Sequence, residues 1–157
     1  MLKNAAISCI AAASIFAFSA RAQDSARSCH ATPETGDNRV GEAYGLTGTW
    51  IGDERLAALR LTDGEPLGAI GPGDSIVLKH LWWALGYRPP MERDLSVSIV
   101  ELNRRDGSVH ISAVTNAKID DTWYMMVGLS FSDPGCWEVT GTYREQTVSF
   151  VVEVRPE

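Results

Sequence analysis

The chain has 157 residues, 45% of them hydrophobic, and its 20 acidic and 14 basic side chains give a formal net charge of −6. Acidic surfaces repel the phosphates of nucleic acids and anionic lipids, so the composition argues against both kinds of partner. The length is typical of one domain and is sufficient to bury a core without the help of a metal ion.

The N-terminus has the pattern of a secretory signal peptide. Residues 1–4 are a short start made basic by Lys3, residues 5–18 form an apolar run, and residues 19–22 (Ser-Ala-Arg-Ala) place small residues where signal peptidase cleaves. The apolar run is shorter than the roughly 20 residues that span a bilayer, which disfavours a retained anchor. We therefore predict a signal peptide over residues 1–22, export to the periplasm or the medium, and no transmembrane segment after cleavage.

Residues 23–43 predict a flexible leader, because they are rich in Ser, Ala, Asp, Glu, Thr and Gly and show no apolar period. Two cysteines remain after cleavage, Cys29 in this leader and Cys136 near the end of the chain. An exported protein meets an oxidising compartment, so we expect these cysteines to form a disulfide; two free thiols are the alternative. The folded domain is then predicted to cover residues 44–157.

The first elements of this domain are expected to be short. Residues 45–50 predict a strand, and residues 56–61 predict a strand or a single helical turn. Glycine and proline recur throughout residues 64–74, which predicts a loop. Residues 75–83 then favour a strand that places Ile76, Leu78, His80 and Trp82 on one face.

The second half of the chain alternates apolar and polar residues, as strands do. Residues 95–99 predict a half-buried strand, which a turn at 105–107 is expected to pair with residues 109–114 in a hairpin. Residues 115–121 are interpreted as a polar link. Residues 123–131 predict a long strand with one apolar face, and the last strand, near 148–155, alternates in the same way.

The stretch from Phe131 to Tyr143 is expected to define the fold. Pro134 and Gly135 break the preceding strand, after which Trp137, Val139 and Tyr143 share a face and Cys136 lies on the other. The spacing Asp133-x-Gly135-x-Trp137 resembles the Asp-x-Gly-x-Tyr corner of immunoglobulin-like domains. Trp stands where the family has Tyr, and Val139 stands where antibody domains have a cysteine, so neither the corner hydrogen bond nor the inter-sheet disulfide carries over.

Three further stretches resemble a family of small exported bacterial proteins that is known only as uncharacterised. They are the PGCWEVTG motif (residues 134–141), Lys79–Tyr87 and Thr115–Ala117. The resemblance implies the same fold and export, and it implies no activity. The predicted fold class is all-β: an immunoglobulin-like antiparallel β-sandwich, preceded by the signal peptide and the flexible leader.

Residues 81–90 hold the most unusual cluster of aromatic residues. Two neighbouring Trp residues in a strand point to opposite faces, so one can fill the core while the other is covered by the Arg-Pro-Pro loop. In the competing hypothesis the cluster forms an exposed contact patch for a protein or carbohydrate of the periplasm or envelope, since exposed aromatics with a nearby Arg are typical of recognition surfaces. That patch would contain Trp82, Trp83, Tyr87 and Arg88, together with Trp50 and Tyr124.

Catalytic and metal-binding signatures are weak. No two of His30, His80 and His110 have a ligand-like spacing, although His80 and His110 could converge in a copper site of an exported β-sandwich. The sequence has no Gly-x-Ser-x-Gly motif, and the acidic pairs 53–54 and 120–121 lie on predicted turns. We expect a non-catalytic binding or envelope-associated structural module without a cofactor; the alternatives are the copper-binding protein and a small secreted hydrolase or hydrolase inhibitor.

Overall fold

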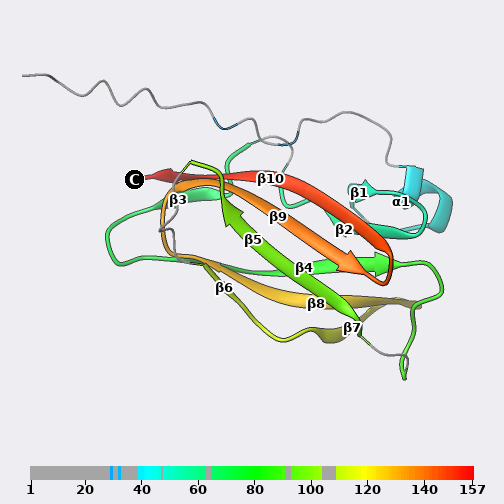
Figure 1. Ribbon diagram of the computed structural model, residues 1–157. Coiled ribbons are helices and arrows are strands. Elements are labelled where there is room, and N and C mark those ends of the chain that lie inside the picture. The colour runs from blue at the N-terminus through cyan, green and yellow to red at the C-terminus, as the bar shows by residue number, and fades with distance from the viewer. Residues whose placement is uncertain are drawn as a thin grey trace, which may run out of the picture.

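The computed structural model describes Cys29, Thr32 and residues 39–46, 48–62, 65–90, 93–103 and 109–157. The predicted signal peptide and His30 lie outside the described residues. The described residues form one helix and ten strands (Figure 1): α1 (Arg39–Tyr44), β1 (Trp50–Gly52), β2 (Leu56–Leu59), β3 (Gly68–Ile70), β4 (Ile76–Ala84), β5 (Leu95–Glu101), β6 (Val109–Ile111), β7 (Thr115–Ile119), β8 (Thr122–Phe131), β9 (Gly135–Tyr143) and β10 (Gln146–Pro156).

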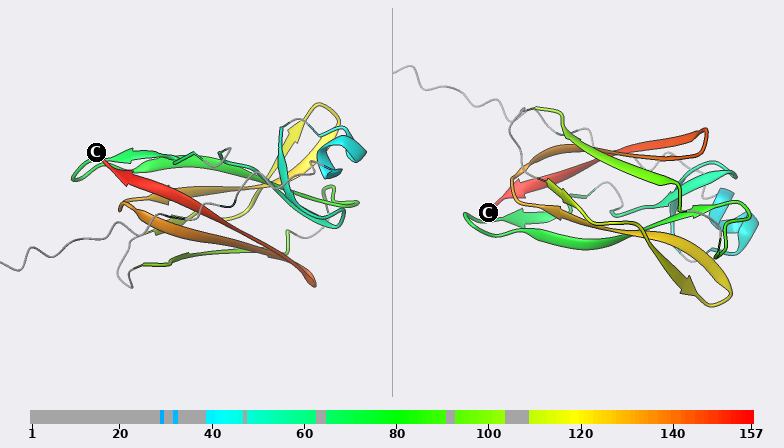
Figure 2. Two further views of the ribbon diagram at one scale, coloured as in Figure 1. Left: turned by 90° about the horizontal axis from the view of Figure 1, so that it is seen from above. Right: turned by 60° about the horizontal axis from the view of Figure 1, so that its bottom comes forward.

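The strands form two sheets, which Figure 2 shows as separate layers. Sheet A has the order β1-β2-β4-β8-β6, with β7 also paired to β8, and sheet B has the order β3-β10-β9-β5. Immunoglobulin-like sandwiches pack their first, second, fifth and fourth strands against the third, sixth and seventh. The order β2-β4-β8-β6 facing β5-β9-β10 reproduces this arrangement, and the short β3 adds a parallel partner to β10. The predicted fold class is confirmed.

The core lies between the sheets and follows the alternation of the sequence. Trp82 from β4 is fully buried, and its ring lies over Gly141 of β9, where a Cβ atom would overlap the ring. Trp137, Val139 and Tyr143 point into the same core, as predicted. Absence of a side chain at Gly141 therefore creates the space that the large indole of Trp82 fills.

The corner between β8 and β9 also has the expected form. The ring of Trp137 packs edge-on against Phe131 with their centroids 5.7 Å apart. Its buried Nε1 has no hydrogen-bond partner in the described part of the chain, which agrees with the expectation that the family's corner hydrogen bond does not carry over to Trp. The corner is held by packing of the two rings.

The predicted hairpin between residues 95–99 and 109–114 is wrong. β5 pairs with β9 in sheet B, whereas β6 pairs with β8 in sheet A, so the chain crosses between the sheets after β5. Both strands bear an inward apolar face, and alternation does not distinguish two strands that face each other across the core from two that pair.

Two predicted loops contain strands. Residues 115–121 hold β7, and residues 64–74 hold β3. β6 and β7 lie along the same edge of β8, but the register shifts by one residue between them: Ile111 pairs with Leu129, and Thr115 pairs with Met126. The extra residue forms a bulge, at which the Gly128 N–H donates to Ser112 Oγ at 2.7 Å.

A second apolar cluster covers one end of the outer face of sheet A. Helix α1 and the segment after it bring Val40 and Leu46 onto Trp83 and Tyr124, and Trp50 stacks on Tyr124 with ring centroids 5.6 Å apart. Helix α1 therefore begins inside the predicted leader, at Arg39. The helix has six residues, too few to give the sequence a visible helical period.

Candidate functional site

The aromatic residues of the predicted contact patch are buried. Trp82 is 0% exposed, Trp83 6% and Tyr87 5%, while Arg88 alone is exposed. Trp50 and Tyr124 are buried as well. The patch therefore lacks the exposed rings that the contact hypothesis requires.

Each ring has a partner inside the protein. Trp82 fills the core, and Trp83 lies under α1 with its ring centroid 4.6 Å from that of Tyr44, rather than under the Arg-Pro-Pro loop. The hydroxyl of Tyr87 donates to Asn116 Oδ1 at 2.6 Å. Burial explains these aromatic residues as parts of two cores, and it corrects the expectation of a surface patch.

The two histidines proposed as copper ligands lie on opposite faces of sheet A. His80 pairs with Val127, which points inward, whereas His110 pairs with Ser130 on the outer face. The sheet thus separates the imidazoles, and His80 with His110 cannot bind one ion. Within the described ranges no three His, Cys, Asp or Glu side chains gather in a way that could hold a metal.

His80 instead belongs to the core. Its ring packs edge-on against Trp82 and Phe150, and its Nε2 lies 2.6 Å from the carbonyl oxygen of Leu59. That distance assigns the proton to Nε2, which donates to the carbonyl. Burial lowers the pKa of His80 to about 4, although the Leu59 hydrogen bond opposes the shift. The imidazole is therefore neutral at pH 7 and supports the end of β2.

The acidic pairs have structural roles in turns. Asp53 Oδ1 accepts the backbone N–H groups of Arg55 at 2.8 Å and Leu56 at 3.2 Å, and the Arg55 hydrogen bond lowers the pKa of Asp53. Asp121 forms an exposed ion pair with Lys118 at 3.3 Å, beside Asp120 in the β7–β8 turn. These carboxylates are accounted for by turn geometry and solvation.

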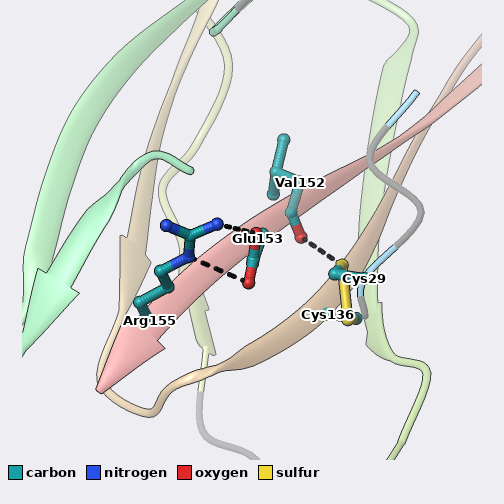
Figure 3. Close-up of polar contacts among 5 residues, drawn as sticks. All are labelled: Cys29, Cys136, Val152, Glu153 and Arg155. Carbon is teal, nitrogen blue, oxygen red and sulfur yellow. Dashed lines mark hydrogen bonds and ion pairs between the residues drawn. A yellow bond between two sulfur atoms is a disulfide. The ribbon is translucent and has the colours of Figure 1, made fainter. Parts of the chain in front are cut away.

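The predicted disulfide between Cys29 and Cys136 is present (Figure 3) and joins positions 107 residues apart, with Cα atoms 5.5 Å from each other. Cys136 lies on the outer face of β9, as the alternation predicted, so the leader crosses the outer surface to reach it. Cys29 Sγ is 3.7 Å from the carbonyl oxygen of Val152. A disulfide sulfur carries no hydrogen, so this approach is a packing contact.

Thr32, three positions after Cys29 in the sequence, bonds to the edge of β10. The Thr32 N–H donates to the Val151 carbonyl at 3.1 Å, and the Val151 N–H donates to Thr32 Oγ1 at 2.7 Å. On its other side the carbonyl of Thr32 accepts from the Arg60 guanidinium at 3.0 Å, just after β2. Thr32 therefore links the two sheets at one side of the sandwich.

The opposite side of the sandwich is open along β5. This seven-residue strand pairs only with β9 among the described strands. The Leu102 N–H donates to Cys136 O at 2.8 Å, so even-numbered residues of this segment direct their backbone groups toward β9. The backbone groups of Leu95, Val97 and Ile99 consequently point away from the sheet, and none of the described residues forms a backbone hydrogen bond with them.

Apolar side chains flank this open edge. Val97 and Ile99 of β5, and Val109 and Ile111 of β6, point inward but are only half buried. Val100 is 57% exposed and Leu102 50%, next to the edge on the other face. The two sheets therefore leave a partly covered apolar margin where the sandwich is not closed.

The alternation of residues 95–99 revealed the strand, but the sequence held no signal that it would be an edge. Edge position depends on which strands pair, which is a long-range property. Thr32 and Arg60 were missed for the same reason, since they are far apart in sequence and meet only in the folded chain.

No helix in the described ranges is long and apolar enough to cross a membrane. Comparisons with protein-family models, with curated proteins and with solved structures found no match, so the geometry of the chain alone supports a functional conclusion.

Proposed function

We propose that the protein is an exported, non-catalytic binding module that receives an extended polypeptide segment of a periplasmic or envelope protein along the edge of β5. The observation that carries this proposal is the outer edge of β5, where Leu95, Val97 and Ile99 have no backbone partner among the described residues, together with its half-buried apolar margin. An added strand would bond to the outward backbone groups of Leu95, Val97 and Ile99, the mode of recognition known as β-augmentation.

The other edges carry the devices that natural sheets use against strand addition. β1 has only three residues, and the edge made by β6 and β7 is broken by the bulge at Ser112. The C-terminal half of the β10 edge, from Val151 onward, is covered by β3 and by Thr32. β5 is long and regular, and its six residues from Leu95 to Val100 include no proline and no charge. An edge of this kind is a natural template for another strand.

The apolar margin indicates the chemistry of the partner. A strand that continues sheet B beside β5 would place alternate side chains toward Val97 and Ile99 and toward Val109 and Ile111. Apolar side chains at every second position would remove this margin from water, while the positions between them would lie beside the polar Ser96 and Ser98. We therefore expect an extended segment of alternating apolar and polar residues.

Amide hydrogen exchange, resolved by residue, tests the proposal. The Val97 and Ile99 amides point away from the sheet and should exchange rapidly in the free protein, whereas the Ser96 and Ser98 amides bond to β9 and should exchange slowly. Addition of a fractionated envelope extract should slow exchange at Val97 and Ile99 specifically. Slowing spread over other surfaces, with Val97 unchanged, would contradict binding at β5.

The variant Val97→Pro supplies the matched control. It removes one outward donor and leaves the ladder to β9 intact, because prolines are tolerated where an edge N–H faces solvent. We expect it to fold and to lose the envelope-dependent protection at Ile99. Retained protection in this variant would argue against strand addition.

A further inference from the structure

The side chains of β5 are nearly symmetric about Val97. A serine stands on either side of it, Ser96 before and Ser98 after, and beyond each serine stands a branched apolar residue, Leu95 or Ile99. The strand therefore presents almost the same pattern when it is read in the opposite direction. β5 itself thus has the alternation of apolar and polar residues that we expect of a segment bound at its edge.

The backbone of β5 has the directions that pairing with a second copy requires. The outward groups of Leu95, Val97 and Ile99 have no backbone partner among the described residues. A twofold axis at Val97 would place Val97 opposite its equivalent in the second copy, and Leu95 opposite Ile99. All residues in these three opposed pairs have outward groups, and each pair can exchange two N–H···O=C hydrogen bonds, which gives about six in total.

The side chains match in the same arrangement. Directly opposed residues of an antiparallel pair place their side chains on the same face. Leu95, Val97 and Ile99 point inward, so the apolar inner face would continue from one copy into the other. On the outer face Ser96 would lie opposite Ser98 of the second copy, where the two hydroxyls can bond to each other.

Charged residues select this register over its neighbours. With the axis at Val97, the basic Arg93 comes opposite the acidic Glu101 of the second copy, and the symmetry repeats this pair at the other end. An axis one residue earlier would place Ile99 opposite Arg93, and an axis one residue later would place Leu95 opposite Glu101. Facing residues of opposite charge stabilise a strand pair, whereas a charge facing an apolar residue does not, so the axis at Val97 is favoured.

The symmetry also brings the two apolar margins together. A twofold axis that joins two strands into one sheet is perpendicular to that sheet, so the A sheets of both copies lie on the same side of the joined B sheets. β6 is an edge strand of sheet A, and its half-buried Val109 and Ile111 would then face their equivalents across the axis. A second copy would therefore cover the margin that one copy leaves partly exposed to water.

We propose that β5 is also a self-association surface, through which two copies pair antiparallel with the twofold axis at Val97. This inference rests on the same open edge as the proposed function, and it gives that edge a means of regulation. The outward groups of β5 cannot bond to a second copy and to a partner segment at the same time, so the homodimer is the closed form of the binding site. A contact of one short strand is smaller than a standard interface, so the dimer should be transient and dependent on concentration.

Disulfide trapping tests the register. Full chains carrying Ser96→Cys are mixed with full chains carrying Ser98→Cys in oxidised glutathione, which accepts the two electrons. In the proposed register these positions face each other directly, with Cα atoms about 4.5 Å apart, whereas each is only diagonal to its own equivalent. We expect the covalent heterodimer to form about tenfold faster than either homodimer, because only the facing positions meet the geometry of a disulfide.

The outcome of trapping is decisive in both directions. A heterodimer that forms no faster than the two homodimers would overturn the pairing about Val97. Val97→Pro in both chains removes the central N–H groups and should bring the heterodimer down to the rate of the homodimers. Cooperative unfolding followed by tryptophan fluorescence confirms that each variant is folded; if one is not, sedimentation of the wild-type chain still decides the proposal.

Sedimentation of the purified full chain over a range of concentrations tests the association itself. We expect the monomer at low concentration and a growing share of dimer as the concentration rises. Arg93 is exposed, and Arg93→Glu would place like charges opposite each other at both ends of the pair, which should weaken the dimer about tenfold. Arg93→Lys keeps the charge and should associate as the wild type does; equal association of all three chains would contradict the register.

The two proposals for the β5 edge fail in different ways. A chain that sediments as a monomer at every concentration would overturn self-association and leave the proposed function intact, because no envelope extract is present in that measurement. The exchange measurement with extract is made on dilute protein, in which the monomer dominates. Absence of extract-dependent protection at Val97 and Ile99 there, together with a dimer at high concentration, would overturn the proposed function alone.

Discussion

His80 makes the stability of the domain depend on pH. Burial lowers its pKa from 6.5 to about 4, so in the folded state the ring stays neutral while in the unfolded state it gains a proton below pH 6.5. The unfolded state then binds more protons between pH 6.5 and pH 4. The contribution to stability is therefore fully present above pH 6.5 and is lost as pH falls through this window.

The size of the effect follows from the shift in pKa. Each unit corresponds to 1.36 kcal/mol, so the free energy of unfolding should fall by about 3 kcal/mol over the whole window and by about 2 kcal/mol between pH 7 and pH 5. His80→Gln removes the titration, and its side-chain amide can still donate to the carbonyl of Leu59. The variant should therefore lose the part of the pH dependence that His80 causes.

Urea unfolding at pH 7, 6 and 5, followed by tryptophan fluorescence, measures both proteins. The free energy of unfolding of wild type should fall by about 2 kcal/mol more than that of His80→Gln between pH 7 and pH 5. His110→Gln, at an exposed position of β6, controls for the loss of a histidine and should follow the wild type. Parallel curves for wild type and His80→Gln would refute the reasoning.

Three further substitutions test the packing. Trp83→Ala should lower the free energy of unfolding by about 3 kcal/mol and speed amide exchange in α1, because the ring lies beneath that helix; unchanged exchange there would argue against the packing. Gly141→Ala should cost about 3 kcal/mol in urea unfolding, because its Cβ would overlap the Trp82 ring, and a neutral effect would contradict the contact. Arg144→Asn should raise thermal stability by about 0.5 kcal/mol, because Arg144 has a φ of 54°, which Asn tolerates better; a loss of stability would assign more weight to the contact of Arg144 with the Tyr143 ring.

Local alternation predicted the faces of the strands well. Trp137 and Val139 lie in the core and Cys136 lies outside, because side chains of neighbouring residues in a strand point to opposite faces. That placement also allowed the disulfide, since only an outward Cys136 can meet a leader that crosses the surface. The fold class followed from strand spacing and from the corner at Asp133.

The same alternation could not predict which strands pair with each other or which segments cover the faces of the sheets. The turn predicted at residues 105–107 indicates a reversal of the chain, and a reversal occurs equally in a hairpin and in a crossing between sheets. Trp83 was a candidate for exposure because neighbouring residues of a strand point to opposite faces, and Val40, which packs in the same cluster, belongs to the predicted leader, whose composition suggests disorder. Both errors concern long-range contacts, on which a single sequence carries little information.

The outer face of sheet B explains why we place recognition at strand edges. At the end of this face near the β9–β10 turn, hydroxyl side chains of the two strands bond to each other: Thr140 with Ser149 at 2.7 Å, and Thr142 with Thr147 at 3.1 Å. These pairs satisfy one another and present no apolar area to bury.

On sheet A the aromatic end of the outer face is already covered by α1. Among the described residues, backbone groups without partners are thus concentrated at the strand edges. A new hydrogen bond can form there without the loss of an existing one. Among the described strands, β5 presents such groups at Leu95, Val97 and Ile99, which is the reason for placing the proposed partner segment there.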